Sequence, residues 1–315
     1  MATHTKPTDD EIGRWLAGYG SSPLVAVRGI PQGSVNSNFA VATRDRRYFL
    51  RIYEEQDLAG ATADAALTIA LARRGVPTPQ PIARTDGSTI ASLAGKPAAL
   101  LPWVEGEMIC QRGVTPEVAE RVGAALARVH VAGVDELAGA SRFGPRELFE
   151  RLDTIEADAR FGEVGVRFRE ALSACLLART SELPAGLVHG DLFRDNVLWQ
   201  RGELSALLDF ESASRGAFVF DLAVTVLAWC YGDALDHTLV RAMSRGYHSV
   251  RALDERERSG GFEEARFAAV RFSITRVTDY AMRGGVDRVI KDYKRFEARL
   301  AALDALGRAG FEALL

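Results

Sequence analysis

Residues 187–210, LVHGDLFRDNVLWQRGELSALLDF, limit the possible folds of this chain more than any other segment. Short apolar runs alternate there with polar and turn residues, which predicts short strands joined by a loop and by a tight turn at Gly202. Asp191 follows the first run, Asn196 lies five residues later, and Asp209 ends the last run. Both carboxylates are therefore expected at the edges of loops.

These residue types at this spacing suit phosphoryl transfer. Such a reaction has a loose transition state, so an enzyme mainly positions the attacking hydroxyl and neutralises charge with metal ions. Asp191 would orient a substrate hydroxyl and accept its proton, whereas Asn196 and Asp209 offer hard oxygen ligands for Mg²⁺ between protein and ATP. His189 would brace the loop. A lone His-Gly-Asp also occurs in solvated turns, but the combination favours a kinase catalytic loop.

Hydrophobic periodicity and turn residues predict strands at the front of the chain and helices behind. Strands are expected at 24–30, 38–43, 47–54, 88–93 and 96–104, and helices at 8–16, 58–74 and 117–130. Thr8 and the acidic residues after it are typical of a helix start. The order predicts an α+β chain with an antiparallel-sheet, nucleotide-binding N-lobe at 1–104. A mainly helical C-lobe at 105–315 would carry catalysis and substrate binding.

Two features of the first lobe suit nucleotide phosphates. Gly29 and Gly33, between the first two strands, let the backbone approach phosphates closely; glycines that serve only hairpin geometry are the alternative. Arg51 projects from the third strand, where kinases place a Lys that pairs with ATP phosphates. A guanidinium grips phosphate bidentately, so the role is retained; an exposed arginine in a solvated row is the alternative. Asp64 is either a partner of Arg51 or a surface acid.

Composition excludes several classes of protein. A formal net charge of −3 removes the electrostatic motive for binding nucleic acid, which needs clustered basic residues. No apolar run reaches the roughly 18–20 residues that a membrane helix requires, and the start of the chain lacks the apolar core of a signal peptide. We therefore expect a cytoplasmic protein without a membrane partner. Cys110, Cys175 and Cys230 are widely spaced and predict reduced thiols. The sequence indicates no oligomeric state.

Several segments resemble the aminoglycoside phosphotransferase and choline kinase superfamily, whose fold is two-lobed and protein-kinase-like. HGDLFRDNVL is similar to its catalytic loop, GSVNSNF to its phosphate loop, GKPAALLPWVEG to its hinge, and FDLAVTVLAWC to the helix after the metal-binding Asp. The resemblance implies that Asp191 is the catalytic base and that Asn196 and Asp209 bind Mg²⁺. The implied ATP contacts are Gly33, Ser34, Asn36, Asn38 and Arg51 at the phosphates, and Leu101 and Trp103 of the hinge 101–104 at adenine.

Within this superfamily the chain looks like the bacterial homoserine kinases, which make O-phosphohomoserine in threonine biosynthesis. The resemblance implies homoserine as the small-molecule substrate. One departure lies in the helix after the metal-binding Asp, where the family often has Asn-Asp before Trp-Cys and this chain has Leu227 and Ala228. Asp221, at the start of that helix, is retained. It would brace the catalytic loop or cap the helix.

A zwitterionic amino acid needs a cation for its carboxylate and an anion for its ammonium. Arg276, Asp279 and Arg283 recur at helical spacing, and we expect Arg276 and Asp279 to contact the substrate. An ion-pair row on the surface is the alternative. Two other functions stay open. One is a sister kinase for choline, a methylthio-sugar, an aminoglycoside or another amino alcohol. The other is a silent nucleotide-binding protein, which the complete set of base and metal residues argues against.

Overall fold

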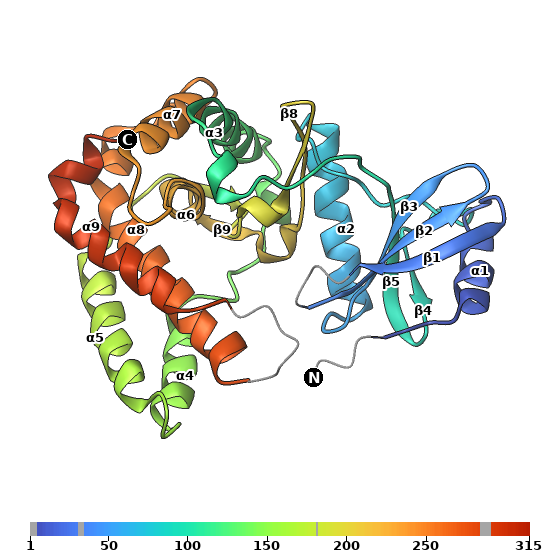
Figure 1. Cartoon of the computed structure of the whole chain (residues 1–315), viewed down its shortest axis with the longest axis horizontal. Coiled ribbons are helices and arrows are strands. Elements are labelled where there is room, and N and C mark those ends of the chain that lie inside the picture. The colour runs from blue at the N-terminus through green and yellow to red at the C-terminus, as the bar shows by residue number, and fades with distance from the viewer. Residues whose placement is uncertain (1–4, 31–34, 181, 284–290) are drawn as a thin grey trace. The chain divides into compact units, whose positions relative to one another are not determined.

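The computed structural model describes residues 5–30, 35–180, 182–283 and 291–315 (Figure 1). The chain forms two compact units. The first comprises Met1–Glu107 and Leu198–Glu211, and the second comprises Met108–Val197 and Ser212–Leu315. Sequence analysis assigned residues 105–107 and Leu198–Glu211 to the second lobe. Backbone hydrogen bonds explain the difference, because Glu107 and Trp199 exchange two of them (2.8 and 2.9 Å) and Leu207 N–H donates to Pro77 (2.6 Å).

The first unit is built on a five-stranded sheet whose strands pair antiparallel in the order β1-β2-β3-β5-β4. Its elements are α1 (Asp9–Ala17), β1 (Leu24–Ile30), β2 (Ser37–Thr43), β3 (Arg47–Ile52), α2 (Leu58–Arg73), β4 (Ile90–Leu93), β5 (Lys96–Pro102) and β8 (Glu203–Leu207), which pairs with β7 (Val197–Gln200). The strands and helices predicted for this part of the chain are confirmed. The helix start at Thr8 is also confirmed, with a capping box formed with Glu11.

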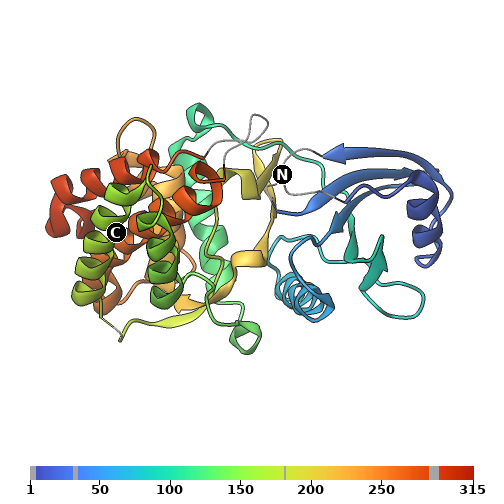
Figure 2. The ribbon, with the colours of Figure 1, turned by 90° about the horizontal axis from the view of Figure 1, so that it is seen from below.

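Alternation along the strands assigns the two faces of this sheet. Leu50 and Ile52 of β3 point to the face that α1 covers, where they join Ile12 and Leu16 in one buried cluster. The other face carries a second cluster that includes Ala61 and Ala65 of α2. Figures 1 and 2 show the two helices on different sides of the sheet. Arg51, which lies between Leu50 and Ile52 in β3, therefore belongs to the α2 face.

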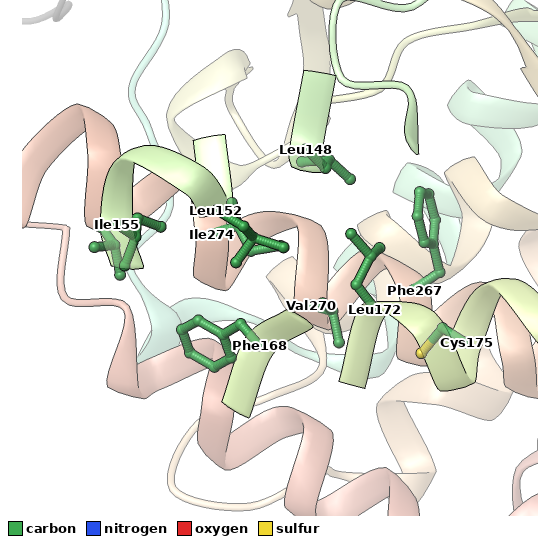
Figure 3. Packing of buried hydrophobic residues seen from close by; sticks show 10 residues of the cluster. Leu148, Leu152, Ile155, Phe168, Leu172, Cys175, Phe267, Val270 and Ile274 are labelled. Atoms are coloured by element: carbon green, nitrogen blue, oxygen red, sulfur yellow. The ribbon is translucent and has the colours of Figure 1, made fainter. Parts of the chain in front are cut away.

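The second unit is mainly helical. Its elements are α3 (Pro116–His130), α4 (Pro145–Glu156), α5 (Gly162–Ala178), β6 (Ala185–Val188), β9 (Ser214–Ala217), α6 (Phe218–Trp229), α7 (His237–His248), α8 (Glu255–Arg276) and α9 (Lys294–Glu312). α4, α5 and α8 enclose the core shown in Figure 3, which includes Leu152, Phe168 and Ile274. α3 and α7 pack closely. Gly246 permits this approach, since a Cβ atom there would collide with the backbone of Glu120.

The described part of the chain thus has the predicted division between a sheet-rich first unit and a helical second unit. Within that part, no helix is both long and apolar enough to cross a membrane. All three cysteines are free thiols, and Cys175 and Cys230 are buried.

Candidate functional site

The loop that carries Asp191 leaves strand β6 directly. β6 pairs antiparallel with β9, and the register joins Val188 to Ser214. Gly190 has a φ of +75°, and a Cβ atom there would lie 2.8 Å from the backbone oxygen of Ser212. Glycine is required on both counts, because a side chain disfavours this φ and there is no room for one. The turn leaves Asp191 partly exposed just beyond the strand.

Asp221, in the first turn of α6, anchors this loop. Its buried carboxylate accepts hydrogen bonds from the backbone N–H groups of His189 (2.6 Å) and Gly190 (2.8 Å). His130 Nε2 lies 3.0 Å from the same carboxylate, and its Nδ1 lies 2.7 Å from the Tyr247 hydroxyl. A carboxylate only accepts, so Nε2 is the protonated ring nitrogen. Although burial opposes it, the hydrogen bond from His130 lowers the pKa of Asp221, which keeps the anchor charged.

Asn196 is positioned by the same loop. It ends a short 3₁₀ turn, Arg194–Asn196, and is 9% exposed. Its Nδ2 donates to the backbone oxygen of Asp191 at 2.8 Å. Because a carbonyl needs the NH₂ group as donor, this bond fixes the orientation of the amide and leaves its oxygen as the remaining group. A neutral oxygen held this way is a suitable ligand for Mg²⁺.

In the first unit, Arg51 is the centre of a partly buried charge cluster, in which the Arg51 and Asp209 side chains are 18% and 40% exposed. Its Nη1 lies 2.9 Å from Glu211 Oε1 and 3.8 Å from Asp209 Oδ1, and the Glu211 side chain is only 6% exposed. Although burial lowers it, the carboxylates of Asp209 and Glu211 raise the pKa of Arg51 above its usual value. Asn36 also donates to Glu211 through its Nδ2. The cluster contains two carboxylates and one guanidinium, so it has an excess of negative charge.

Two atoms of this cluster have unused bonding capacity. Asp209 Oδ1 and Arg51 Nε are buried, and neither forms a hydrogen bond with any part of the chain that the structure describes. Asp209 also has a φ of +62°, a left-handed conformation that costs energy for a residue with a side chain. A buried free acceptor in a cluster with excess negative charge suits a divalent cation. A buried free N–H of arginine suits phosphate. The residues present therefore fit Mg²⁺ and a nucleotide phosphate.

The predicted phosphate loop is only partly visible. Gly33 and Ser34 lie outside the described residues. Asn36 and Asn38 are both 9% exposed, and Asn38 of β2 is directly opposite Arg51 of β3. Sequence analysis offered Asp64 as a partner of Arg51. Its carboxylate instead accepts a hydrogen bond from the Tyr53 hydroxyl (3.0 Å). Burial raises the pKa of Asp64.

The hinge residues differ in their surroundings. Leu101 of β5 packs against the cluster on the α2 face of the sheet. Trp103 lies under the guanidinium of Arg47, whose Cζ is 4.2 Å from the ring centroid, and Arg47 also pairs with Glu105 (3.1 Å). Trp103 and Arg47 line a cavity of about 570 Å³, and Leu101 is not among its lining residues. Trp103 and Leu101 therefore do not share one pocket wall.

The predicted substrate residues Arg276 and Asp279 have partners within the second unit. Asp279 pairs with Arg151 at 2.6 Å and with Arg283 at 3.9 Å. Arg276 donates to the backbone oxygen of Asp292 at 3.0 Å. Burial and the nearby Arg295 lower the pKa of Arg276 to about 10. Asp279 thus takes part in ion pairs, whereas Arg276 forms none with the residues of described placement.

The helix that departs from the family pattern contributes backbone groups instead of side chains. Leu227 and Ala228 are fully buried, at 0% and 1% exposure. The carbonyl of Leu227 accepts from Arg299 Nε (2.8 Å), and that of Ala228 accepts from Arg194. Cations at the C-terminal end of a helix are favourable because of the helix dipole. These two positions therefore hold arginines in place through their carbonyl oxygens.

Sequence reasoning missed four residues of this site: His130, Tyr247, Glu211 and Arg271. Glu211 could have been found, because it stands two positions after Asp209 in a loop already singled out. His130 and Tyr247 carry no local signal, since His130 meets Asp221, and Tyr247 meets His130, only through tertiary packing. Arg271, which is 3% exposed, donates to the backbone oxygen of Gly190 at 3.1 Å.

The model of the phosphotransferase enzyme family matches residues 26–253. The chain belongs to this family. It is 36% identical to a homoserine kinase from Afipia carboxidovorans, over 89% of this chain and 87% of that protein. It is 33% identical to a homoserine kinase from Methylobacillus flagellatus, over 94% and 93% of the two chains.

Solved structures show the same fold at low identity. A spectinomycin phosphotransferase in complex with ADP and spectinomycin matches with a TM-score of 0.69 and 14% identity, over 97% of this chain and 98% of that one. An amicoumacin kinase in complex with AMP-PNP and Ca²⁺ matches with a TM-score of 0.71 and 16% identity, over 96% and 92%. The predicted protein-kinase-like α+β fold is confirmed.

Proposed function

We propose that the chain is an ATP-dependent homoserine kinase, which transfers the terminal phosphoryl group of ATP to the side-chain hydroxyl of L-homoserine and makes O-phosphohomoserine for threonine biosynthesis. The observation that carries the proposal is the likeness to homoserine kinases at 33% to 36% identity over about nine-tenths of the chain. Likeness at this coverage includes both units of the chain and is not confined to the loop that carries Asp191.

The second unit supplies the base. Asp191 would align the homoserine hydroxyl and accept its proton as the phosphoryl group is transferred. Asp221 and Gly190 serve this step indirectly, because the two backbone N–H bonds to the buried carboxylate fix the loop before substrate binds. A loop fixed in advance loses little entropy when the reaction begins.

The first unit supplies the nucleotide contacts. When bound, ATP provides the phosphoryl group and Mg²⁺ neutralises charge on its oxygens. Arg51 would donate its free Nε to a phosphate, and Asp209 would offer its free Oδ1 to the metal ion. Asn196, whose amide oxygen is the other predicted metal ligand, belongs to the second unit. Glu211 holds the guanidinium of Arg51 in place for this contact.

Several sister functions use the same chemistry, so the decisive experiment is a substrate panel. ADP release by the purified protein is measured with Mg²⁺-ATP and L-homoserine, choline, methylthioribose or kanamycin, with Asp191→Ala as the control. We expect homoserine turnover well above ATP hydrolysis without acceptor, and O-phosphohomoserine as the product by phosphorus NMR. Homoserine turnover at the background rate, alongside turnover of another alcohol, would replace homoserine with that acceptor. No turnover of any acceptor would remove the proposed function.

A further inference from the structure

A small cavity lies beside the catalytic loop inside the second unit. Its volume is about 150 Å³, and Gly190, Ser212, Ser214, Phe143 and Arg271 are among its lining residues. Gly190 directly precedes Asp191 in the chain, so one lining residue of the cavity is the neighbour of the residue that would handle the substrate hydroxyl. None of the described residues that line it is acidic.

Arg271 is the buried charge of this cavity. It comes from α8, is 3% exposed, and its guanidinium contacts two aromatic rings, with Cζ 4.1 Å from the centroid of Phe143 and 3.9 Å from that of Phe272. Its one hydrogen bond within the described residues is the donation from Nη1 to the backbone oxygen of Gly190. A guanidinium has five N–H groups, so most of its donor capacity is unused.

The charge of Arg271 is also not balanced by an ion pair within the described residues. Among the described residues, no carboxylate forms an ion pair with it, whereas Arg179, which lines the same cavity, has a bidentate partner in Glu264 (2.7 and 2.8 Å). Burial lowers the pKa of Arg271 to about 10, and the charges of Asp191 and Asp221 oppose that lowering only in part. A buried unpaired cation is costly unless a ligand brings the missing anion.

We propose that this cavity binds the carboxylate of the acceptor amino acid, with Arg271 as its main partner. The inference rests on the proposed function and adds the residue that recognises the substrate. A planar guanidinium with two free N–H groups matches a carboxylate bidentately. A cavity of roughly 150 Å³ holds a molecule the size of benzene, whereas drug-sized ligands need about 300 Å³ or more. The size therefore fits one end of a small amino acid and excludes an aminoglycoside ring system.

The same contact links recognition to the catalytic loop. Arg271 donates to the carbonyl of Gly190, and the N–H of Gly190 donates to Asp221. A carboxylate on the free edge of the guanidinium would hold Arg271 against that carbonyl. A correct acceptor would then fix the peptide unit next to Asp191. An alcohol without a carboxylate would bind with the guanidinium unsatisfied, and it would be a poor substrate.

The kinetic test compares L-homoserine with 3-aminopropan-1-ol, which is homoserine without its carboxylate. For the wild-type protein, kcat/KM should favour homoserine, and Arg271→Met should reduce that preference about 100-fold. Arg271→Lys, which keeps the charge but not the fork, should restore part of the preference. If Arg271 only positions Gly190, both alcohols would lose rate equally and the preference would stay unchanged, which overturns the proposal.

Arg266→Met is the matched control, because Arg266 lies on the same helix and already pairs with Glu263 and Asp304. We expect it to leave the preference for homoserine as in the wild type. A fall in preference as large as that of Arg271→Met would show a general effect of charge on α8 and would count against the cavity.

A binding test separates this inference from the proposed function. L-2-aminobutyrate, which has the carboxylate but no hydroxyl, should raise the melting temperature of the wild-type protein. It should raise that of Arg271→Lys only in part and that of Arg271→Met not at all. This result would support the cavity even if homoserine were not phosphorylated. Equal stabilisation by inorganic phosphate would reassign the site to anions in general, and no stabilisation of the wild type together with an unchanged preference would end the proposal.

Discussion

Two arginines, one in each unit, have opposite electrostatic surroundings, and Arg51 is partly buried whereas Arg271 is buried. Arg51 has Glu211 at 2.9 Å and Asp209 at 3.8 Å, and these carboxylates raise its pKa despite burial. Arg271 has no carboxylate partner among the described residues, and burial lowers its pKa to about 10. The same side chain therefore lies in a site with excess negative charge in the first unit and in a site with excess positive charge in the second.

The difference indicates what each site lacks. Around Arg51 the missing charge is positive, which a metal ion accompanying ATP would bring. Around Arg271 the missing charge is negative, which the carboxylate of an amino acid would bring. The residues around each arginine, and not the arginines themselves, would thus decide which ligand binds: the metal ion near Arg51 and the carboxylate near Arg271. Substitutions near Arg51 should therefore change ATP binding and spare acceptor binding, and substitutions near Arg271 should do the reverse.

The largest expected effect is that of Asp191→Ala, which tests this separation directly. Turnover should fall by about 10³-fold to 10⁴-fold, because the base that accepts the hydroxyl proton is removed. The affinity for ATP, measured by displacement of a fluorescent nucleotide, should change little, because the proposed nucleotide contacts of the first unit are untouched. Loss of ATP affinity on the scale of the turnover loss would show that the two units do not act separately.

Arg51→Met should be next in size and should reduce stability as well as activity. It leaves the buried carboxylate of Glu211 without its cation, which costs about 3 kcal/mol of unfolding free energy. It also removes the N–H group that is proposed to donate a hydrogen bond to an ATP phosphate, so KM for ATP should rise about 100-fold. Denaturant unfolding and initial rates at varied ATP provide the two measurements.

The double variant Arg51→Met with Glu211→Gln is the control for this cluster. It removes both charges of the closest pair, so most of the lost stability should return while KM for ATP stays high. Recovery of neither would mean that the ion pair is not what stabilises the first unit, and the comparison of the two arginines would lose its basis.

Asp209→Asn should have a smaller effect, confined to the metal requirement. Asn tolerates the left-handed φ of +62° at this position at least as well as Asp, so the backbone should be preserved. The Mg²⁺ concentration for half-maximal activity should rise about 10-fold, because the anionic ligand is replaced by a neutral one. An unchanged Mg²⁺ dependence at saturating ATP would remove Asp209 from the metal site.

Much of the fold could be predicted because its signals are local. Thr8 and Glu11 form the capping box that their spacing indicates, and the turn at Arg201 and Gly202 has the positive φ angles, 53° and 80°, of a two-residue hairpin. The fold class followed from the same periodicities. The unit to which this hairpin belongs could not be predicted, because the hydrogen bonds from residues 199 and 207 to Glu107 and Pro77 join positions far apart in the chain.

The site divides in the same way. Asp191, Asn196 and Asp209 could be selected because their residue types and their spacing along the chain already mark them. Asp221 could be selected only in outline, since its partner His130 comes from another helix, 91 residues away. Arg271 could not be selected, because its importance depends on burial and on a missing partner. A one-dimensional pattern records neither property.

Arg276→Met is the smallest expected effect and decides between two arginines of α8. Both lack a carboxylate partner among the described residues, but only Arg271 lines the cavity. Arg276 instead donates to the carbonyl of Asp292 and lies over the ring of Phe296, with Cζ 4.4 Å from the centroid. We expect its loss to change KM for homoserine about twofold, the scale of a partly exposed cation–π contact. The helical-spacing argument for Arg276 predicts a change as large as that of Arg271→Met. Measuring KM for homoserine with both variants side by side therefore shows which arginine of α8 meets the substrate.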